Sequence, residues 1–481
     1  MLSAITVDIG TTSVKLCVFD DEARLLASAR QPTPVHRDEW AEIYDIEGLT
    51  ELITGFIGGL EAWQRALVKR IAITGVGESG GLVLPDLRLA SPMILWHDHR
   101  GARYFSVLTP EQRARIYEVT GLPVNANYGL SKVAWALDSA GGNAPGAVWL
   151  NIAEYVAGLM TGERYAEHTL ASRTLALDLT TREWSGEVCG FVGIDPAVFP
   201  MLRSARDGVA VTTAFAHSTG LSADVLVHVA GHDHMVGGVG ADLRDGDLLN
   251  STGTTEGLLF TSSSPHLSPD ARRAKLANGI ACGGEGYTLF ASIPTGGSAF
   301  ATLQSILGLD GEQLTGQIDL LHQKYLSGDI DITRTPLVLP QFRGAPPPTK
   351  NAAARGIITG LRTDTELSEV IFGAFLGMVL QYRDVLDLFP TTARQVKVIG
   401  PASKNPLWLQ LKADLLATPL SVSAFPEVVS RGAQALASAA RADWVQTAPF
   451  DVHPDAERSA RLEAWFDGVR RQWEYVKGFP A

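Results

Sequence analysis

Two stretches of the chain share one pattern, in which an apolar run ends in a Gly-Thr-Thr turn. The first covers residues 5–9 and turns at Gly10, and the second covers residues 248–252 and turns at Gly253. Each turn leads into a further apolar run, so each stretch predicts a β-hairpin that opens a domain. The two glycines lie almost half of the 481 residues apart, which indicates two homologous halves.

The segments that follow each hairpin alternate between strand-like and helix-like patterns. In the first half we expect helices at 49–60, 132–137 and 152–160 and strands at 70–76 and 225–230. In the second half we expect helices at 367–388, 406–416 and 432–440, a strand at 396–399, a loop at the prolines 346–348 and a charged terminal helix at 455–476. Strands that alternate with helices predict an α/β fold, with sheets covered by helices.

The composition is that of an ordinary globular protein and argues against several classes. Hydrophobic residues make up 46% and charged residues 19%, and the length predicts about two to four domains. The net charge of −12 argues against nucleic acid or an anionic membrane surface as the main partner. No apolar run reaches the roughly 20 residues of a membrane helix, and the first residues carry no signal-peptide pattern. Cys17, Cys189 and Cys282 include no C-x-x-C pair, so we expect a cytoplasmic enzyme without a disulfide framework.

The two hairpin turns have the chemistry of a phosphate site. Glycine lets backbone N–H groups approach a phosphate closely, and threonine hydroxyls add donors. Asp8, just before Gly10, is a carboxylate suited to Mg²⁺ held through water. A plain hairpin turn explains an isolated Gly-Thr-Thr, but a pair at this spacing favours phosphate binding.

The pair of hairpins resembles the duplicated ATPase fold that actin shares with sugar kinases. Further segments, in the same order along the chain, resemble the motifs of the FGGY carbohydrate kinases, in particular the xylulokinase-like members. These segments are 8–15 (D-I-G-T-T-S-V-K), 96–100 (W-H-D-H-R), 132–135 (K-V-A-W), 231–234 (G-H-D-H), 343–346 with 354–361, and 400–405. The order of the motifs is far more specific than any one of them.

The resemblance implies an α/β fold of duplicated actin-like (ribonuclease H-like) ATPase domains with an interdomain cleft. It implies an N-terminal FGGY domain at 1–245 that binds the sugar and holds the catalytic base, a C-terminal FGGY domain at 246–440 that binds ATP, and a helical tail at 441–481. The expected function is phosphorylation of a small ketose such as xylulose, or of a polyol of four to six carbons, with ATP and Mg²⁺. A homodimer is left open, and no nucleic acid or membrane partner is expected.

The resemblance also implies roles for single residues. Asp233 stands at the position of the catalytic base, where a carboxylate takes the proton of the substrate hydroxyl. Predicted contacts to the sugar are Glu78, Ser79, Trp96, Asp98, His232 and His234. Predicted contacts to the nucleotide and its phosphates are Gly10, Thr11, Thr12, Lys15, Gly253, Thr254, Thr255, Gly296, Gly400, Ser403 and Asn405, with Asp8 on Mg²⁺.

Four of these residues have a second interpretation. Asp233 is also placed to cap the turn that follows it. Lys15 is also compatible with a surface strand, and Trp96 with the core. Asp98 is also placed for an ion pair with Arg100 instead of a sugar contact.

The segment expected to set sugar specificity departs most from the family. Xylulokinase-like members carry S-G-Q-M-H-G there and glycerol kinases an Arg-Glu pair, whereas this chain has V-G-E-S-G-G at 76–81. Small residues after Glu78 predict an open pocket with a carboxylate in it. We therefore expect glycerol to be a poor substrate. In the adenosine motif, Pro401 and Ala402 replace the family's consecutive glycines.

Two other functions compete with the kinase. Residues 77–81 fit G-x-S-x-G, so Ser79 is a candidate nucleophile of an α/β-hydrolase, but a second strand rather than a helix is predicted after it. A non-catalytic nucleotide-binding regulator on the same fold is the other candidate. His232 and His234 with one Asp make a poor zinc set, so we expect them to orient Asp233 or contact the sugar.

Overall fold

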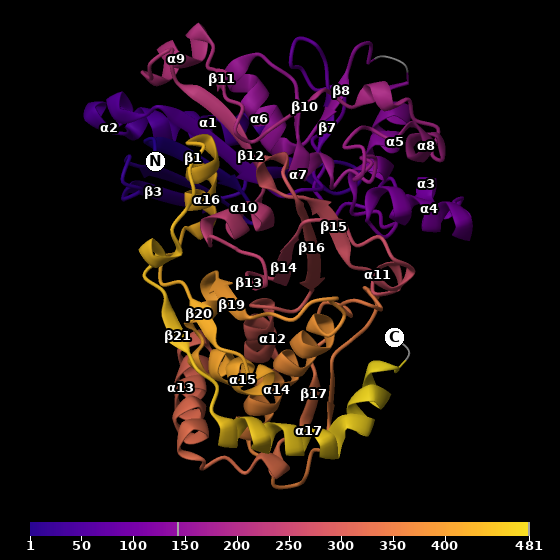
Figure 1. Cartoon of the computed structure of the whole chain (residues 1–481), viewed down its shortest axis with the longest axis vertical. Helices are drawn as coiled ribbons and strands as arrows, with labels where there is room; N and C mark the ends of the chain where they lie inside the picture. Colours follow the sequence, from indigo (N-terminus) through magenta and orange to yellow (C-terminus); the bar gives the residue numbers. More distant parts are fainter. Residues whose placement is uncertain (142–143, 480–481) are drawn as a thin grey trace.

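The computed structural model describes residues 1–141 and 144–479. The chain forms two α/β halves, one above the other in Figure 1, and each half is built on one large mixed sheet. The N-terminus lies in the upper half and the C-terminus beside the lower half (Figure 1). The predicted duplication and the actin-like α/β class are confirmed by these two sheets.

The first sheet has the strand order β11-β12-β6-β1-β2-β3. The bounds of its strands are β1 Ala4–Ile9, β2 Ser13–Phe19, β3 Leu25–Pro32, β6 Arg70–Gly75, β11 Val209–Ala210 and β12 Leu226–His232. β1 and β2 form the predicted antiparallel hairpin, and β1 also pairs in parallel with β6, which in turn pairs in parallel with β12. Every residue of β1 is buried, as expected of a central strand covered on both faces.

The second sheet has the order β15-β16-β14-β13-β19-β20-β21. Its strands are β13 Asp247–Thr252, β14 Glu256–Ser262, β15 Ala277–Ile280, β16 Tyr287–Ile293, β19 Gln395–Ile399, β20 Leu420–Val422 and β21 Phe450–Val452. β13 and β14 form the second hairpin, and β13 pairs in parallel with β19. This hairpin beside a parallel strand repeats the arrangement of β1, β2 and β6.

Helices cover both sheets, and their bounds follow the predicted periodicity closely. In the first half they are α1 Ile46–Gly59, α2 Ala62–Leu67, α3 Arg103–Ser106, α4 Pro110–Thr120, α5 Gly129–Ala140, α6 Ile152–Thr161, α7 His168–Ala171, α8 Gly186–Gly190, α9 Thr213–Thr219 and α10 Asp233–Gly240. In the second half they are α11 Pro269–Arg273, α12 Ser298–Leu307, α13 Gly311–Ser327, α14 Leu367–Leu386, α15 Pro406–Leu416, α16 Val428–Ala437 and α17 Ala456–Lys477. The helix expected at 432–440 is α16, which begins four residues earlier.

Short strand pairs and single 3₁₀ turns complete the fold. The pairs are β4 Val35–Arg37 with β5 Glu42–Tyr44, β7 Gly81–Val83 with β8 Val148–Leu150, β9 Ala166–Glu167 with β10 Leu202–Arg203, and β17 Leu337–Leu339 with β18 Ile357–Thr359. The prolines at 346–348 lie in a turn, as expected.

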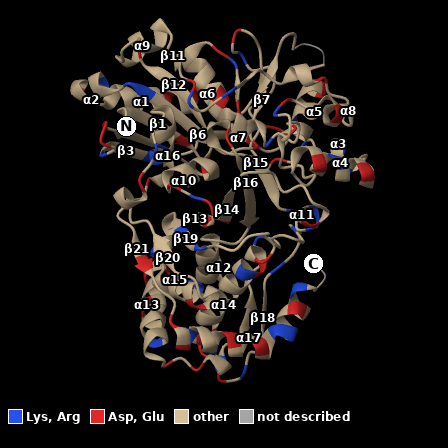
Figure 2. Ribbon diagram, viewed as in Figure 1, with Lys and Arg blue, Asp and Glu red and all other residues tan. Residues whose placement is uncertain are grey.

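The terminal helix α17 packs into the core of the second half. Its Trp473 is fully buried and donates from Nε1 to Asp384 Oδ2 of α14 at 2.8 Å. Leu462 and Phe466 join the same apolar cluster. Acidic and basic residues are interspersed along α17 (Figure 2). No described helix is long and apolar enough to cross a membrane.

Candidate active site

A cleft of about 1680 Å³ separates the two sheets and is lined by both halves. The turns that follow β1 and β13 enter it, as does the junction of β12 with α10. The predicted site residues that line it are Asp8, Gly10, Thr11, Thr12, Lys15, Glu78, Trp96, His232, Asp233, His234, Gly253, Thr254, Thr255, Gly400 and Ser403. The other predicted site residues are buried and do not line the cleft; they are Ser79, Asp98, Gly296 and Asn405.

Asp233 is the first residue of α10, directly after the last residue of β12. Its Oδ1 accepts a hydrogen bond from the backbone N–H of His234 at 2.7 Å and lies 3.4 Å from Nδ1 of His232. The helix cap is His232, whose side chain makes no capping bond, so Asp233 is not the cap. Burial, with the nearby Asp8 carboxylate, raises the pKa of Asp233 to about 6. A carboxyl with that pKa is suited to take a proton near neutral pH.

Asp8 and Lys15 are direct cross-strand partners in the β1–β2 hairpin. Their Oδ2 and Nζ atoms lie 3.0 Å apart at the cleft wall, and the Asp8 carboxylate raises the pKa of Lys15. Glu427 lies nearby, and burial raises its pKa. Lys15 is therefore a half-buried, paired lysine on the cleft and not a free surface side chain.

The acidic residues around Lys15 fit a metal ion that arrives bound to the nucleotide better than one held by the protein alone. Among the described residues, no three His, Cys, Asp or Glu side chains lie together closely enough to hold a metal. Asp8 already shares one oxygen with Lys15, which leaves its other oxygen for a metal-bound water. The residues present thus fit Mg²⁺ held mainly by phosphate oxygens and water.

Glu78 lies across from the paired histidines. Its Oε2 is 3.8 Å from Nε2 of His232, whose ring stacks on His234 with centroids 5.5 Å apart. Burial would raise the pKa of Glu78, but His232 and the cation of Arg173 hold it below the ordinary value. Glu78 is therefore an ionised acceptor for hydroxyl groups.

His234 is held neutral by its surroundings. Its Nδ1 is 2.8 Å from the hydroxyl of Ser251, and burial lowers its pKa to about 4. Its ring also packs on Phe290, with centroids 4.9 Å apart. These contacts fit a positioning role beside Asp233.

Trp96 and Asp98 behave differently although they are two residues apart. Trp96 donates from Nε1 to the Thr11 hydroxyl at 2.9 Å and lines the cleft. Asp98 Oδ2 accepts from Nη2 and Nε of Arg100 at 2.6 and 2.8 Å, and Arg100 also binds Asp38 at 2.8 Å. The observed arrangement of Asp98 is thus the ion pair, the second of its two interpretations.

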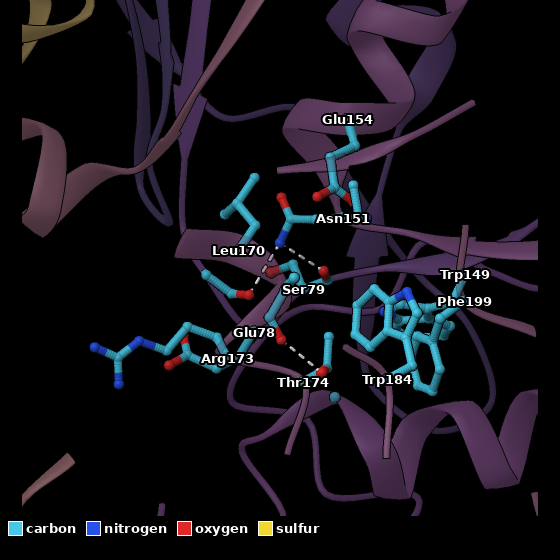
Figure 3. Close-up of a pocket in the computed structure, with 14 residues that line it drawn as sticks. Glu78, Ser79, Trp149, Asn151, Glu154, Leu170, Arg173, Thr174, Trp184 and Phe199 are labelled. Carbon is cyan, nitrogen blue, oxygen red and sulfur yellow. Dashed lines mark hydrogen bonds between the residues drawn. The ribbon is translucent and has the colours of Figure 1, made fainter. Parts of the chain in front are cut away.

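Ser79 lies in the interior and not on the cleft. It is 1% exposed, and its hydroxyl is 3.4 Å from that of Tyr44. The Asn151 side-chain amide donates to the carbonyl oxygens of Ser79 at 2.9 Å and Gly77 at 3.1 Å (Figure 3). Among the described residues, no histidine bonds the Ser79 hydroxyl, and strand β7 follows it instead of a helix. The hydrolase geometry is therefore absent, and this clamp fixes the loop that presents Glu78.

The second hairpin turn is braced from behind. Gly253 donates to the Thr255 carbonyl at 2.9 Å and accepts from the Gly297 N–H at 2.8 Å. Gly296 donates to the Thr254 carbonyl at 3.2 Å, and a Cβ on Gly296 would stand 2.6 Å from the Thr255 backbone. Gly296 thus shapes the turn and does not line the cleft.

In the turn after β19, too, some predicted residues line the cleft and others only support the backbone. Gly400 has φ of +100°, and a Cβ there would stand 2.1 Å from the Thr252 carbonyl oxygen. Ser403 donates to the Gly400 carbonyl at 2.5 Å. Asn405 is buried, and its side chain caps α15 by accepting from the Trp408 N–H at 3.0 Å.

The cleft residues that the sequence reasoning missed include two cations. Arg173 follows α7, and Lys350 lies in the loop before β18. Neither belongs to a motif or to a periodic pattern, so no signal in the sequence marked them.

The fold is a duplicated actin-like one. In its cleft, a carboxyl with a pKa of about 6 shares the wall with two Gly-Thr-Thr turns. These features define a phosphotransferase of the sugar-kinase class. The chain belongs to the FGGY family of carbohydrate kinases, because the model of the N-terminal domain of that family matches residues 3–240 and the model of its C-terminal domain matches residues 248–441. The enzyme is therefore an ATP-dependent kinase of a sugar or polyol, as the motifs predicted.

Individual relatives carry several substrate names. The chain is 26% identical to a glycerol kinase of Nocardia farcinica over 98% of both chains. Its fold is similar to that of a ligand-bound xylulose kinase of Lactobacillus acidophilus, with a TM-score of 0.86 and 18% identity over 99% of both chains. It is equally similar to a gluconate kinase of Lactobacillus acidophilus, at TM-score 0.86 and 18% identity over 99% of this chain and 98% of that chain.

Proposed function

We propose that Asp233 is the catalytic base that activates a hydroxyl of a substrate with four to six carbons. The supporting observation is the position of Asp233 on the cleft that both hairpin turns line, where burial raises the pKa of its carboxyl to about 6. The hydroxyl oxygen bonds to the γ-phosphorus of ATP while the bond from that phosphorus to the bridging oxygen breaks. The proton goes to Asp233, and ADP leaves with the electron pair.

The hairpin turns and Lys15 handle the phosphates in this proposal. The glycines at 10 and 253 let the phosphates come close to the backbone of each turn, and threonine hydroxyls supply donors. Lys15 offsets the charge that develops on the transferred group. Asp8 would hold the Mg²⁺ of ATP through water, and the ion would supply further charge neutralisation.

The proposed nucleotide site lies on the second half and the sugar site mainly on the first. The names of the relatives include glycerol, xylulose and gluconate kinases, so they do not single out one sugar. In this proposal, residues 1–245 bind the sugar, residues 246–440 bind ATP, and residues 441–481 form a tail. Residues 79–81 are buried and do not line the cleft, so the open pocket expected from these small residues is not present there. The carboxylate of Glu78, which does line the cleft, is what favours a ketose or polyol longer than glycerol.

Sugar-dependent release of ADP tests the proposal. A panel of ketopentoses, ketohexoses, C4–C6 polyols, their acids and glycerol should reveal turnover that requires both ATP and Mg²⁺. Nucleotide binding without substrate-dependent ADP release across the panel would instead favour a non-catalytic regulator.

A further inference from the structure

Arg173 and Lys350 are two of the cleft cations that have no acid bound to them among the described residues. Arg173 and Lys350 come from different halves of the chain and face the same cleft. Among the described residues, no carboxylate forms a direct ion pair with either side chain. Cations placed in this way are available to an anion that enters the cleft.

The guanidinium of Arg173 has no direct ion-pair partner among the described residues. The residue is 2% exposed, its Nε has no partner among the described residues, and its Nη2 has only the Met235 sulfur at 3.9 Å. Its guanidinium lies 5.6 Å from the centre of the Phe290 ring. In Figure 3 it points away from the other residues drawn there. Burying an unpaired guanidinium is costly, so this arrangement is best explained by a ligand that pairs with it.

Lys350 approaches the same region from the second half. Burial, together with the nearby cations of Arg173 and Lys275, lowers the pKa of Lys350 to about 8, and Glu78 is the one acid that opposes this shift. Lys275 is occupied, because its Nζ donates to the Thr349 carbonyl at 2.5 Å. Arg173, Lys275 and Lys350 together outweigh the single charge of Glu78, which favours an anion bound beside them.

Resting on the function proposed above, we propose that the substrate is a polyhydroxy acid whose carboxylate is bound by Arg173 and Lys350. Glu78 lies 3.8 Å from His232, the neighbour of Asp233, its charge is coupled to that of Arg173, and all of these residues line the same cleft as Lys350. The acid thus places a hydroxyl at Asp233, an intermediate hydroxyl at Glu78 and its carboxylate at the cations. A guanidinium and an ammonium suit a carboxylate of one charge.

Matched pairs of substrates test this inference. D-Gluconate and D-glucitol, or D-ribonate and ribitol, share their carbon skeleton and differ in the terminal carboxylate. We expect kcat/KM for the better acid to exceed that of its alditol by about 100-fold, because losing one partner of a buried charge pair has an effect of this order. An alditol or ketose used as well as the acids would overturn the inference and leave the proposed kinase function intact.

Variants of Lys350 and Arg173 test whether these two cations cause the preference for the acid over its alditol. Lys350→Gln should reduce the acid-over-alditol ratio by about 10-fold or more with little change in KM for ATP. Arg173→Lys keeps the charge but loses the forked geometry, and should reduce the ratio even if Arg173→Gln fails to fold. Lys324→Gln makes the same change on the exposed face of α13 and should leave the ratio unchanged. A ratio unaffected by both cleft variants, or a shift in KM for ATP alone, would show that the cations serve another ligand.

Direct binding separates the two proposals. Calorimetry with the same acids in the presence of ADP should show binding that weakens about 10-fold or more in Lys350→Gln. Binding of this kind without turnover would support the anion site and count against the kinase function. Acids that are neither bound nor phosphorylated, or a preference for sugar phosphates, would overturn the carboxylate proposal.

Discussion

Gly432 of α16 and Gly240 of α10 lie against each other where the two halves of the chain join. A Cβ on Gly432 would stand 2.8 Å from the Gly240 nitrogen and 2.0 Å from the Val236 carbonyl oxygen. A Cβ on Gly240 would stand 2.0 Å from the Val428 carbonyl oxygen. Because α16 comes from the second half yet packs on β1, β6 and β12, this contact joins the two halves. Close packing there depends on both glycines.

Gly432→Ala should therefore destabilise the protein. The new methyl group has backbone atoms in its way, so the helices must separate, at a cost of about 2 kcal/mol or more. Urea unfolding measures the loss. The matched control is Gly468→Ala in α17, where a Cβ would meet nothing within 4 Å and should add up to about 1 kcal/mol of helix stability. Equal stability of Gly432→Ala and wild type would contradict the tight crossing.

This contact also shows how far sequence reasoning reaches in this chain. The β1–β2 and β13–β14 hairpins and the long helix α14 were predicted, because an apolar period and a glycine turn are local signals. The small residues of α16 predicted a helix, but not that it would pack on the sheet of the other half. That contact depends on tertiary packing and leaves no local pattern.

The site also has residues that the sequence could predict and contacts that it could not. Asp233 and the hairpin glycines stand in recognisable motifs and line the cleft. Asp98 stands in a motif too, but Arg100 holds it, and Arg100 is itself fixed by Asp38, 62 residues away in the chain. Such long-range pairs decide which way a side chain points, and the spacing along the sequence does not contain them.

Replacing the proposed base tests the chemistry. Asp233→Asn keeps the shape and should lower kcat by about 10²–10⁴, because proton removal loses its acceptor. ATP affinity should stay close to that of wild type, since the hairpin turns remain. Single-turnover kinetics with nucleotide titration separate the two effects, and wild-type turnover in the variant would remove Asp233 from the role.

The pH dependence gives an independent check on Asp233. A base acts when it is deprotonated, and burial raises the pKa of this carboxyl to about 6. Activity should therefore be high above pH 6 and fall as the pH drops through that value. The measurement is kcat/KM for the sugar between about pH 5 and 8. A flat profile across this range would mean that the step limiting kcat/KM does not need a base of this pKa.

The second hairpin turn offers a clean test of phosphate binding. At Gly253, the nearest atom to an added Cβ would be the Thr255 carbonyl oxygen at 3.8 Å, so the fold tolerates alanine. Gly253→Ala should raise KM for ATP by blocking close backbone approach, with little change in melting temperature. At Gly10 a Cβ would stand 2.9 Å from the Ser13 carbonyl oxygen, so Gly10→Val should perturb both nucleotide binding and stability. Unchanged steady-state kinetics in a folded Gly253→Ala protein would separate this turn from the nucleotide.

Glu78 provides the test of sugar recognition. The residue is held by the Asn151 clamp on its loop, and its carboxylate is ionised beside His232. Glu78→Gln preserves the shape but replaces one acceptor oxygen by a donor, so a bound hydroxyl loses part of its hydrogen bonding. KM for the preferred substrate should rise by about 10-fold or more while KM for ATP changes little. Glycerol lacks the further hydroxyl that Glu78 is proposed to accept, so we expect it to be a poor substrate of both proteins. The measurement is kcat/KM across substrates of three to six carbons. Two results would show that this segment does not set specificity: a wild type that prefers glycerol, or a Glu78→Gln variant with an unaltered substrate profile.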